Sequence, residues 1–214
     1  MKTINLHHVM PHVFAQVPHL ESEVWNEDLT FEKGKTYLIE ADSGQGKSSL
    51  CAFLMGYRHD YSGSIAFDGT DITTLSVNSW CDIRKHHLSY LFQELRLFPE
   101  LTARENVEIK NILSSHAANE QIDLWFKRLG IEDKQEVKVG HMSFGQQQRV
   151  ALIRALSQPF DFLLLDEPIS HLDDGNAGIM ADVMMEEVKR LGASVIVTSI
   201  GKHMMLDYDK TFRL

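Results

Sequence analysis

Cysteine is scarce in this chain. The 214 residues include only two, Cys51 and Cys81, which form neither a C-x-x-C pair nor any other metal-binding spacing. Their number and placement give no sign of a disulfide framework or a zinc ribbon. A reducing, cytoplasmic compartment is the setting we expect for two such cysteines.

Long hydrophobic runs are also missing. No stretch approaches the roughly 18 consecutive apolar residues that predict a membrane-spanning helix. The first ten residues, MKTINLHHVM, lack the apolar core of a secretory signal. We therefore expect a chain that does not cross a bilayer by itself.

Positive charge is in deficit. The 30 acidic residues outnumber the 21 Lys and Arg, for a formal net charge of −9. Binding a nucleic-acid backbone requires concentrated Lys and Arg, so the charge argues against nucleic acid as the main partner. A negative net charge also keeps a protein soluble, so it does not by itself indicate any other kind of partner.

Histidine is plentiful, yet its pattern does not predict a metal site. The eleven histidines include the neighbouring pairs His7–His8 and His86–His87. Neighbours on a strand point to opposite faces, so we expect neither pair to chelate an ion. No H-E-x-x-H motif is present, which disfavours a structural or catalytic zinc.

The hydrophobic pattern predicts a single α/β domain over residues 1–214 with a βαβ-type core. The region from about 101 to 157 is mostly helical in pattern and is expected to form a lobe inserted into that core. Predicted strands lie at 3–9, 24–31, 35–40, 63–69, 87–92, 160–168, 193–199 and 210–214. One predicted helix follows the glycine-rich loop, and others lie at 102–113, 119–130, 145–156 and 176–191. The helix at 102–113 opens with a capping box of Thr102 and Glu105.

The stretch ADSGQGKSSL, residues 41–50, predicts a phosphate-binding loop between a strand and a helix. Gly44 and Gly46 let backbone N–H groups curl around phosphate oxygens at the helix N-terminus. Lys47 is placed to reach the β- and γ-phosphates, and the Ser48 hydroxyl to bind Mg²⁺. The alternative is a glycine-bearing turn before an ordinary helix, which the order of strand, loop and helix disfavours.

A second motif, FLLLDEP, is a buried strand that ends in acids. Asp166 at its carboxyl end is placed to hold the magnesium shell, and Glu167 to act as general base on a water. Acids at strand ends also serve as helix caps. The phosphate loop earlier in the chain favours the catalytic interpretation.

With these motifs in this order, the chain resembles the ATP-binding cassette (ABC) ATPases. ADSGQGKSS looks like their Walker A loop, FLLLDEP like Walker B, and YLFQE like the Q-loop with Gln93. MSFGQQQR (142–149) resembles the family signature and SHLD (170–173) its D-loop. The resemblance implies a P-loop NTPase core with a mostly parallel sheet, an N-terminal antiparallel β subdomain and the inserted helical lobe.

The resemblance also implies ATP and Mg²⁺ as ligands. Glu167 and Gln93 correspond to the catalytic positions, and Ser48, Gln93 and Asp166 to those around the metal. The nucleotide-binding positions are Phe14, Ser43, Gly44, Gln45, Gly46, Lys47, Ser48, Ser49, Ser143, Gly145 and Gln146.

Ser143, Gly145 and Gln146 begin a predicted helix, whose N-terminus presents a hydroxyl, backbone amides and a positive dipole end to a phosphate. Ser143 as a plain helix cap is compatible with this role. In the family that phosphate belongs to the opposite subunit. We therefore expect a second ABC ATPase subunit, identical or different, as a partner.

Residues 80–107 are similar to the lipoprotein-releasing, macrolide-export and cell-division branch, in which the ATPase works with a permease. An integral-membrane permease subunit is thus the other expected partner, which places the chain on the cytoplasmic face of the inner membrane. We expect the permease to dock in an apolar groove beside Gln93. Its expected walls are Leu95, Leu97, Phe98 and Leu101.

Four positions depart from the family pattern. Ala41 replaces the first loop glycine, which is tolerable if its φ is negative. Phe144 replaces the first signature glycine, where it either crowds the partner's nucleotide or points into the lobe. Phe14 is the candidate for stacking on adenine, with a core Phe as the alternative. Ile200 stands where a histidine normally contacts the γ-phosphate, and His203 is expected to be a surface residue at a helix start.

Three functions fit these features. The leading hypothesis is an ATP-hydrolysing transporter subunit that dimerises on ATP. The second is a slow or regulatory ATP-gated protein of a membrane complex, motivated by Ile200. The third, an ABC ATPase acting on nucleic acid or ribosomes, is disfavoured by the single cassette and the negative charge.

Overall fold

The computed structural model describes residues 1–17 and 20–214, which form two β-sheets and six α-helices. The strands are β1 (Thr3–Pro11), β2 (Asp28–Glu32), β3 (Thr36–Glu40), β4 (Tyr61–Phe67), β5 (Thr70–Asp71), β6 (Leu88–Leu91), β7 (Phe162–Asp166), β8 (Ser194–Ser199) and β9 (Lys210–Arg213). The helices are α1 (Lys47–Leu54), α2 (Val77–His86), α3 (Ala103–Asn111), α4 (Asn119–Arg128), α5 (Phe144–Leu156) and α6 (Asp174–Leu191).

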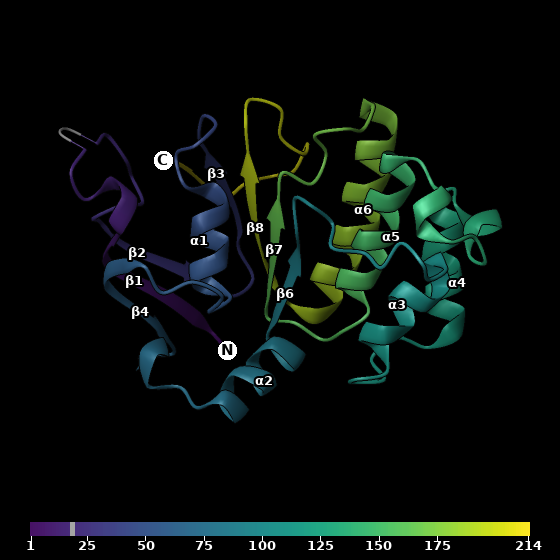
Figure 1. Ribbon diagram of the computed structural model, residues 1–214, viewed down its shortest axis with the longest axis horizontal. Helices are drawn as coiled ribbons and strands as arrows, with labels where there is room; N and C mark the ends of the chain where they lie inside the picture. Colours follow the sequence, from purple (N-terminus) through teal and green to yellow (C-terminus); the bar gives the residue numbers. More distant parts are fainter. Residues whose placement is uncertain (18–19) are drawn as a thin grey trace.

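A five-stranded sheet in the order β6-β7-β8-β3-β9 runs through the middle of the molecule (Figure 1), and all its pairs are parallel. Both faces are covered, as expected for a parallel sheet. Along β7, Leu163 and Leu165 pack into the core shared with the helical side of the molecule. Phe162 and Leu164 pack into the core shared with α1. The prediction of a mostly parallel sheet is confirmed.

The second sheet has the order β2-β1-β4-β5 and is antiparallel. Its strands lie on the far side of α1 from the parallel sheet (Figure 1). The apolar residues of β1, β2 and β4 share one core with α1. The predicted antiparallel β region at the N-terminus is confirmed.

Helices α3 and α4 lie at the other end of the molecule, with α5 and α6 between them and the parallel sheet (Figure 1). Thr102 caps α3 as predicted: its side chain accepts from Glu105 N, and the Glu105 carboxylate accepts from Thr102 N. Helix α5 packs against both α3 and α4. This arrangement separates the start of α5 from the start of α1.

One strand prediction needs correction, and one helix was missed. The strand predicted at 24–31 begins only at Asp28, because Ser22 Oγ accepts from the backbone N–H groups of Val24 and Trp25 and holds them in a turn. Helix α2 was not predicted. Trp80 is its only buried residue, so the helix carries almost no periodic apolar signal.

The prediction that neighbouring histidines point apart is wrong at His7 and His8. The pairing of β1 with β4 shifts register between His7 and Met10, and His8 has a φ of 46°. The bulge leaves both imidazoles exposed, with ring centroids 4.5 Å apart. Gly63 makes room for it, since a Cβ there would lie 2.3 Å from the carbonyl oxygen of His8.

Candidate functional site

The glycine-rich loop links the carboxyl end of β3 to the N-terminus of α1, where Gly46 is the cap residue with a φ of 99°. A Cβ at Gly46 would approach Phe14 Cε2 to 2.9 Å and Trp25 Cζ2 to 3.0 Å. Trp25 Nε1 also donates to the Gln45 carbonyl at 3.1 Å. Two aromatic rings therefore hold the back of the loop, and only glycine fits between them and the α1 N-terminus.

Lys47 is almost fully buried at the base of the loop. Its ammonium donates to the carbonyls of Ala41 and Asp42 at 3.0 and 2.9 Å, and lies 3.7 Å from Glu167 Oε1. Ala41 is not among the described residues with positive φ, so its methyl group introduces no backbone strain. The loop keeps the course of a phosphate loop without the first glycine.

Asp166, at the end of β7, is buried, and each of its carboxylate oxygens accepts a hydrogen bond. Its Oδ1 accepts from Thr198 Oγ1 on β8 at 2.6 Å, and its Oδ2 accepts from the Tyr90 hydroxyl on β6 at 3.1 Å. Burial, together with the nearby Cys51 and Asp166, raises the pKa of Tyr90 far above its ordinary value. Tyr90 therefore stays protonated and donates to Asp166, which fixes the carboxylate plane.

Gln93 contacts both α1 and the segment that follows β7. Its Oε1 lies 3.5 Å from Ser48 Oγ on α1, and its Nε2 donates to Glu167 Oε2 at 3.2 Å. Glu167 itself has a φ of 50°, a left-handed conformation that is costly for a non-glycine residue. The structure thus brings Lys47, Ser48, Gln93 and Glu167 together around one point.

A cavity of about 390 Å³ opens above the loop, a size within the range of small-ligand pockets. Phe14, half-buried, packs against the loop beside Gly46, while Val13 next to it is exposed. Ile200 lies on the same cavity, and His203 instead faces Glu40, 3.6 Å from its carboxylate, in a segment that is not helical. The cavity is lined by Val13, Phe14, Ser43, Gly44, Gly46, Lys47, Ser48, Ser49, Arg58, Gln93, Glu167 and Ile200.

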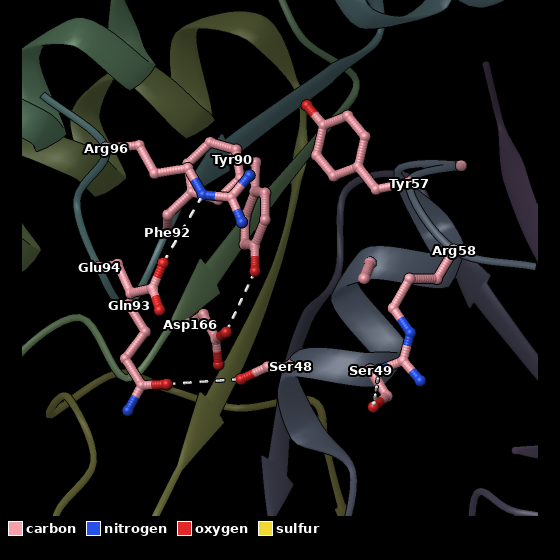
Figure 2. A pocket seen from close by; sticks show the side chains of 12 residues that line it. Ser48, Ser49, Tyr57, Arg58, Tyr90, Phe92, Gln93, Glu94, Arg96 and Asp166 are labelled. Carbon is pink, nitrogen blue, oxygen red and sulfur yellow. Dashed lines mark hydrogen bonds and ion pairs between the residues drawn. The ribbon is translucent and has the colours of Figure 1, made fainter. Parts of the chain in front are cut away.

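The groove expected beside Gln93 has different walls from those predicted. Leu95 belongs to the interior core, where it is 2% exposed, and Leu97 packs against that core. The hollow of about 700 Å³ beside Gln93 combines aromatic side chains with two arginines and with the carboxylates of Glu94 and Asp166 (Figure 2). Its walls include Tyr57, Arg58, Tyr90, Phe92 and Arg96.

The signature residues lie at the start of α5 and do not line the cavity above the loop. Ser143 and Gln146 form a capping box, in which Ser143 Oγ accepts from Gln146 N and Gln146 Oε1 accepts from Ser143 N. Phe144 does not enter the lobe. It is 41% exposed, and its ring packs on that of His171 with centroids 4.4 Å apart.

Trp25 and Tyr90 are the supporting residues that the sequence analysis missed. Trp25 contacts a loop twenty positions later in the chain, and Tyr90 contacts a carboxylate on another strand. Neither contact has a local sequence signal. A hydrogen-bond partner for Tyr90 could have been predicted, since a polar side chain on a buried parallel strand needs one.

Comparison with known proteins agrees with this geometry. Residues 24–170 match the family described as ABC transporter. The chain belongs to this family. It is therefore the ATP-binding subunit of an ABC transporter, and an ATPase.

Its relatives include the lipoprotein-releasing system ATP-binding protein LolD of Buchnera aphidicola, 33% identical over 80% of this chain and 76% of that protein. The ABC transporter ATP-binding protein YbbA of Escherichia coli is 28% identical over 99% and 93% of the two chains. The macrolide export ATP-binding/permease protein MacB of Rhodopseudomonas palustris is 34% identical, but the match covers only 27% of that longer protein.

Among solved structures, the dimeric ABC transporter cassette MJ0796 is similar, with a TM-score of 0.77, 26% identity and coverage of 92% of this chain and 87% of that one. The same cassette in a dimeric post-hydrolysis state with ADP and Pi gives a TM-score of 0.76. Within the described residues of the present chain, no helix has both the length and the apolar composition to cross a membrane.

Proposed function

We propose that the cavity above the phosphate loop binds Mg²⁺·ATP and that Glu167 is the base of its hydrolysis. Lys47 is the one lysine that lines the cavity within the described part of the chain. Its ammonium could bind the terminal phosphates in place of its present partners, the carbonyls of Ala41 and Asp42. The backbone N–H groups of Gly44, Gly46 and Lys47 at the α1 N-terminus supply further donors. The lining of one cavity by both Lys47 and Glu167 is the observation that supports this proposal most.

The residues proposed for Mg²⁺ fit that ion. A hydroxyl, an amide oxygen and a carboxylate from Ser48, Gln93 and Asp166 form a set of hard oxygen donors, which Mg²⁺ prefers. These three side chains would hold the ion, which would supply positive charge to offset the charge that develops on the phosphates. Tyr90 and Thr198 keep the Asp166 carboxylate oriented toward this position.

Glu167 is proposed to accept a proton from the attacking water. Its carboxylate contacts both Gln93 and Lys47, so its orientation depends on the groups that bind the phosphates and the metal. A base held beside the phosphates can orient the water in line with the bond that breaks.

The test of this assignment is ATP binding by Lys47→Ala. Loss of a buried charged donor to phosphate should weaken ATP affinity by about 10- to 100-fold, measured by fluorescence titration. Lys127→Ala, on the exposed side of α4, is the matched control and should bind ATP as the unmodified chain does. Equal affinity in the Lys47→Ala variant would overturn the assignment of the loop.

We further propose that two ABC subunits close on ATP, with Ser143, Gly145 and Gln146 of one facing the nucleotide of the other. Within one chain these residues are not part of the cavity, and the Ser143 hydroxyl, which accepts from Gln146 N, keeps its own proton to donate. The similarity to a dimeric cassette supports this arrangement.

A membrane permease is the proposed second partner, which would hold this subunit against the cytoplasmic side of the inner membrane. The name of the MacB relative joins an ATP-binding part and a permease. The hollow beside Gln93, with its aromatic side chains, is the proposed contact, because it adjoins Ser48 and Gln93, which are proposed to bind the metal (Figure 2). Residues 1–214 would serve as one nucleotide-binding domain, with residues from about 101 to 157 as its helical lobe.

A slow or regulatory ATPase is the second candidate. The observation that favours it is Ile200, which lies on the cavity as an apolar, 41% exposed side chain with no hydrogen bond to offer a phosphate.

A further inference from the structure

Arg58 lies just beyond the C-terminal end of α1, and its side chain reaches back to the first turn of that helix. Its Nη1 donates to Ser49 Oγ at 2.9 Å, and its Nε donates to Asp60 Oδ1 at 2.9 Å. A second contact joins Nη2 to Asp60 Oδ2. In Figure 2, Arg58 and Ser49 lie together on the side of the hollow opposite Phe92 and Arg96.

Among the described residues, Arg58 is the one arginine that lines the cavity above the phosphate loop. The other cation there, Lys47, lies beside Glu167 at the end where hydrolysis is proposed to occur. Arg58 approaches from the side of Ser49, and its described polar partners do not include Asp166 or Glu167. The two positive charges therefore flank different parts of the cavity.

The geometry around Arg58 prepares Ser49 to donate. The Ser49 hydroxyl oxygen accepts from the guanidinium, which leaves its own proton free for an acceptor in the cavity. A donor to a hydroxyl oxygen also strengthens the bond that this hydroxyl donates. Hydrogen bonding from Arg58 lowers the pKa of Asp60, so this carboxylate stays ionised and holds the guanidinium in place.

Asp60 connects this arrangement to the turn that carries Phe14. Its carbonyl accepts from His12 N at 2.9 Å, at the beginning of the turn His12–Phe14. These contacts thus link the turn that carries Phe14, through Asp60 and Arg58, to the first turn of α1.

We propose that Arg58 is a positioning residue for the nucleotide: it orients the Ser49 hydroxyl and adds positive charge beside the phosphates that ATP and ADP share. This role rests on the proposed function, since it requires nucleotide in this cavity. Because Arg58 acts away from Glu167, it contributes to binding both nucleotides and not to the cleavage step.

The experiment is fluorescence titration of ATP and ADP against Arg58→Ala, Ser49→Ala and the double variant. Arg58→Ala should weaken both nucleotides by a similar factor, about 3- to 10-fold for a partly exposed charged donor. In the double variant, the loss of affinity should be smaller than the product of the two single losses, because both substitutions remove the same interaction. Arg58→Lys, which keeps the charge and loses the fork geometry, should fall between Arg58→Ala and the unmodified chain.

Arg128→Ala is the matched control. Arg128 on α4 is likewise paired with a carboxylate, that of Glu186, and lies outside both hollows. It should leave both affinities unchanged.

Three results would overturn the role of Arg58: unchanged affinities in Arg58→Ala, loss of ATP affinity alone, or effects that multiply with those of Ser49→Ala. Each of these leaves the proposed function intact as long as Lys47→Ala weakens ATP binding as expected. If instead Lys47→Ala binds ATP normally, the proposed site is wrong, and that failure is distinguishable from the failure of the Arg58 proposal.

Discussion

Ile200 is a single residue at which the speed of this ATPase can be tested. It follows β8 directly and lies on the same cavity as Lys47 and Glu167. A side chain that donates to the phosphate in the transition state speeds hydrolysis, and isoleucine has no donor. His203 does not replace it, because its ring packs near Tyr208 and faces Glu40.

Ile200→His should therefore raise the turnover of ATP, by a factor on the order of the 10²-fold typical of one transition-state donor, while ATP affinity changes little. Steady-state phosphate release measures this. Ile112→His, on an exposed position after α3, serves as the control for an added histidine. If the unmodified chain already hydrolyses ATP rapidly and the histidine adds nothing, another group performs this role.

Thr198 shows how one hydroxyl stabilises a buried charge. It is fully buried on β8 and donates to Asp166 Oδ1 at 2.6 Å. Thr198→Val removes this donor and leaves a buried carboxylate oxygen unpaired, at a cost of about 1–3 kcal/mol in the free energy of unfolding. Urea denaturation measures the loss. Thr211→Val, at an exposed position of β9, should change the free energy by less than about 0.5 kcal/mol; an equal effect at both positions would contradict the argument.

At the scale of the helix, the caps differ in a way that can be tested. Helices α3 and α5 begin with capping boxes, whereas the cap residue of α4 is Ala118, which makes no side-chain bond. Ala118 is exposed, has the extended backbone of a cap and stands three positions before Gln121.

Ala118→Ser should complete a capping box on α4 and raise the free energy of unfolding by about 0.5–1 kcal/mol. Ala118→Gly, which lacks the hydroxyl, is the control and should give less of this gain. A serine variant no more stable than the glycine variant would show that the α4 N-terminus is already satisfied by solvent.

For the whole molecule, we expect a partner subunit, because the signature residues do not line the cavity above the phosphate loop. With Glu167→Gln to prevent hydrolysis, ATP should convert the chain to a dimer, seen by gel filtration with light scattering. Adding Ser143→Arg should abolish the dimer while each monomer still binds ATP. Ser62→Arg, on an exposed part of β4, should not. A dimer that persists with Ser143→Arg would place the interface elsewhere.

Much of the fold was predictable because its signals are local. Capping boxes depend on residues three positions apart, and buried strands such as β7 appear as continuous apolar runs. Helix α2 escaped prediction because it buries one side chain, and β2 began late because the Ser22 hydroxyl holds the preceding residues in a turn. In both cases a single contact, the burial of Trp80 or the hydrogen bonds to Ser22, decides the structure, and a single contact leaves no repeating apolar pattern in the sequence.

The sequence by itself determined that a phosphate loop, a strand ending in Asp166 and a signature helix follow in family order, since each motif depends on near neighbours. Only the tertiary structure decided how their side chains meet. The register of β6, β7 and β8 sets Tyr90 and Thr198 on either side of Asp166. Gln93 and Arg58 reach α1 from separate loops. Such contacts join residues far apart in the chain, and their geometry follows from the packing of the strands and helices that carry them.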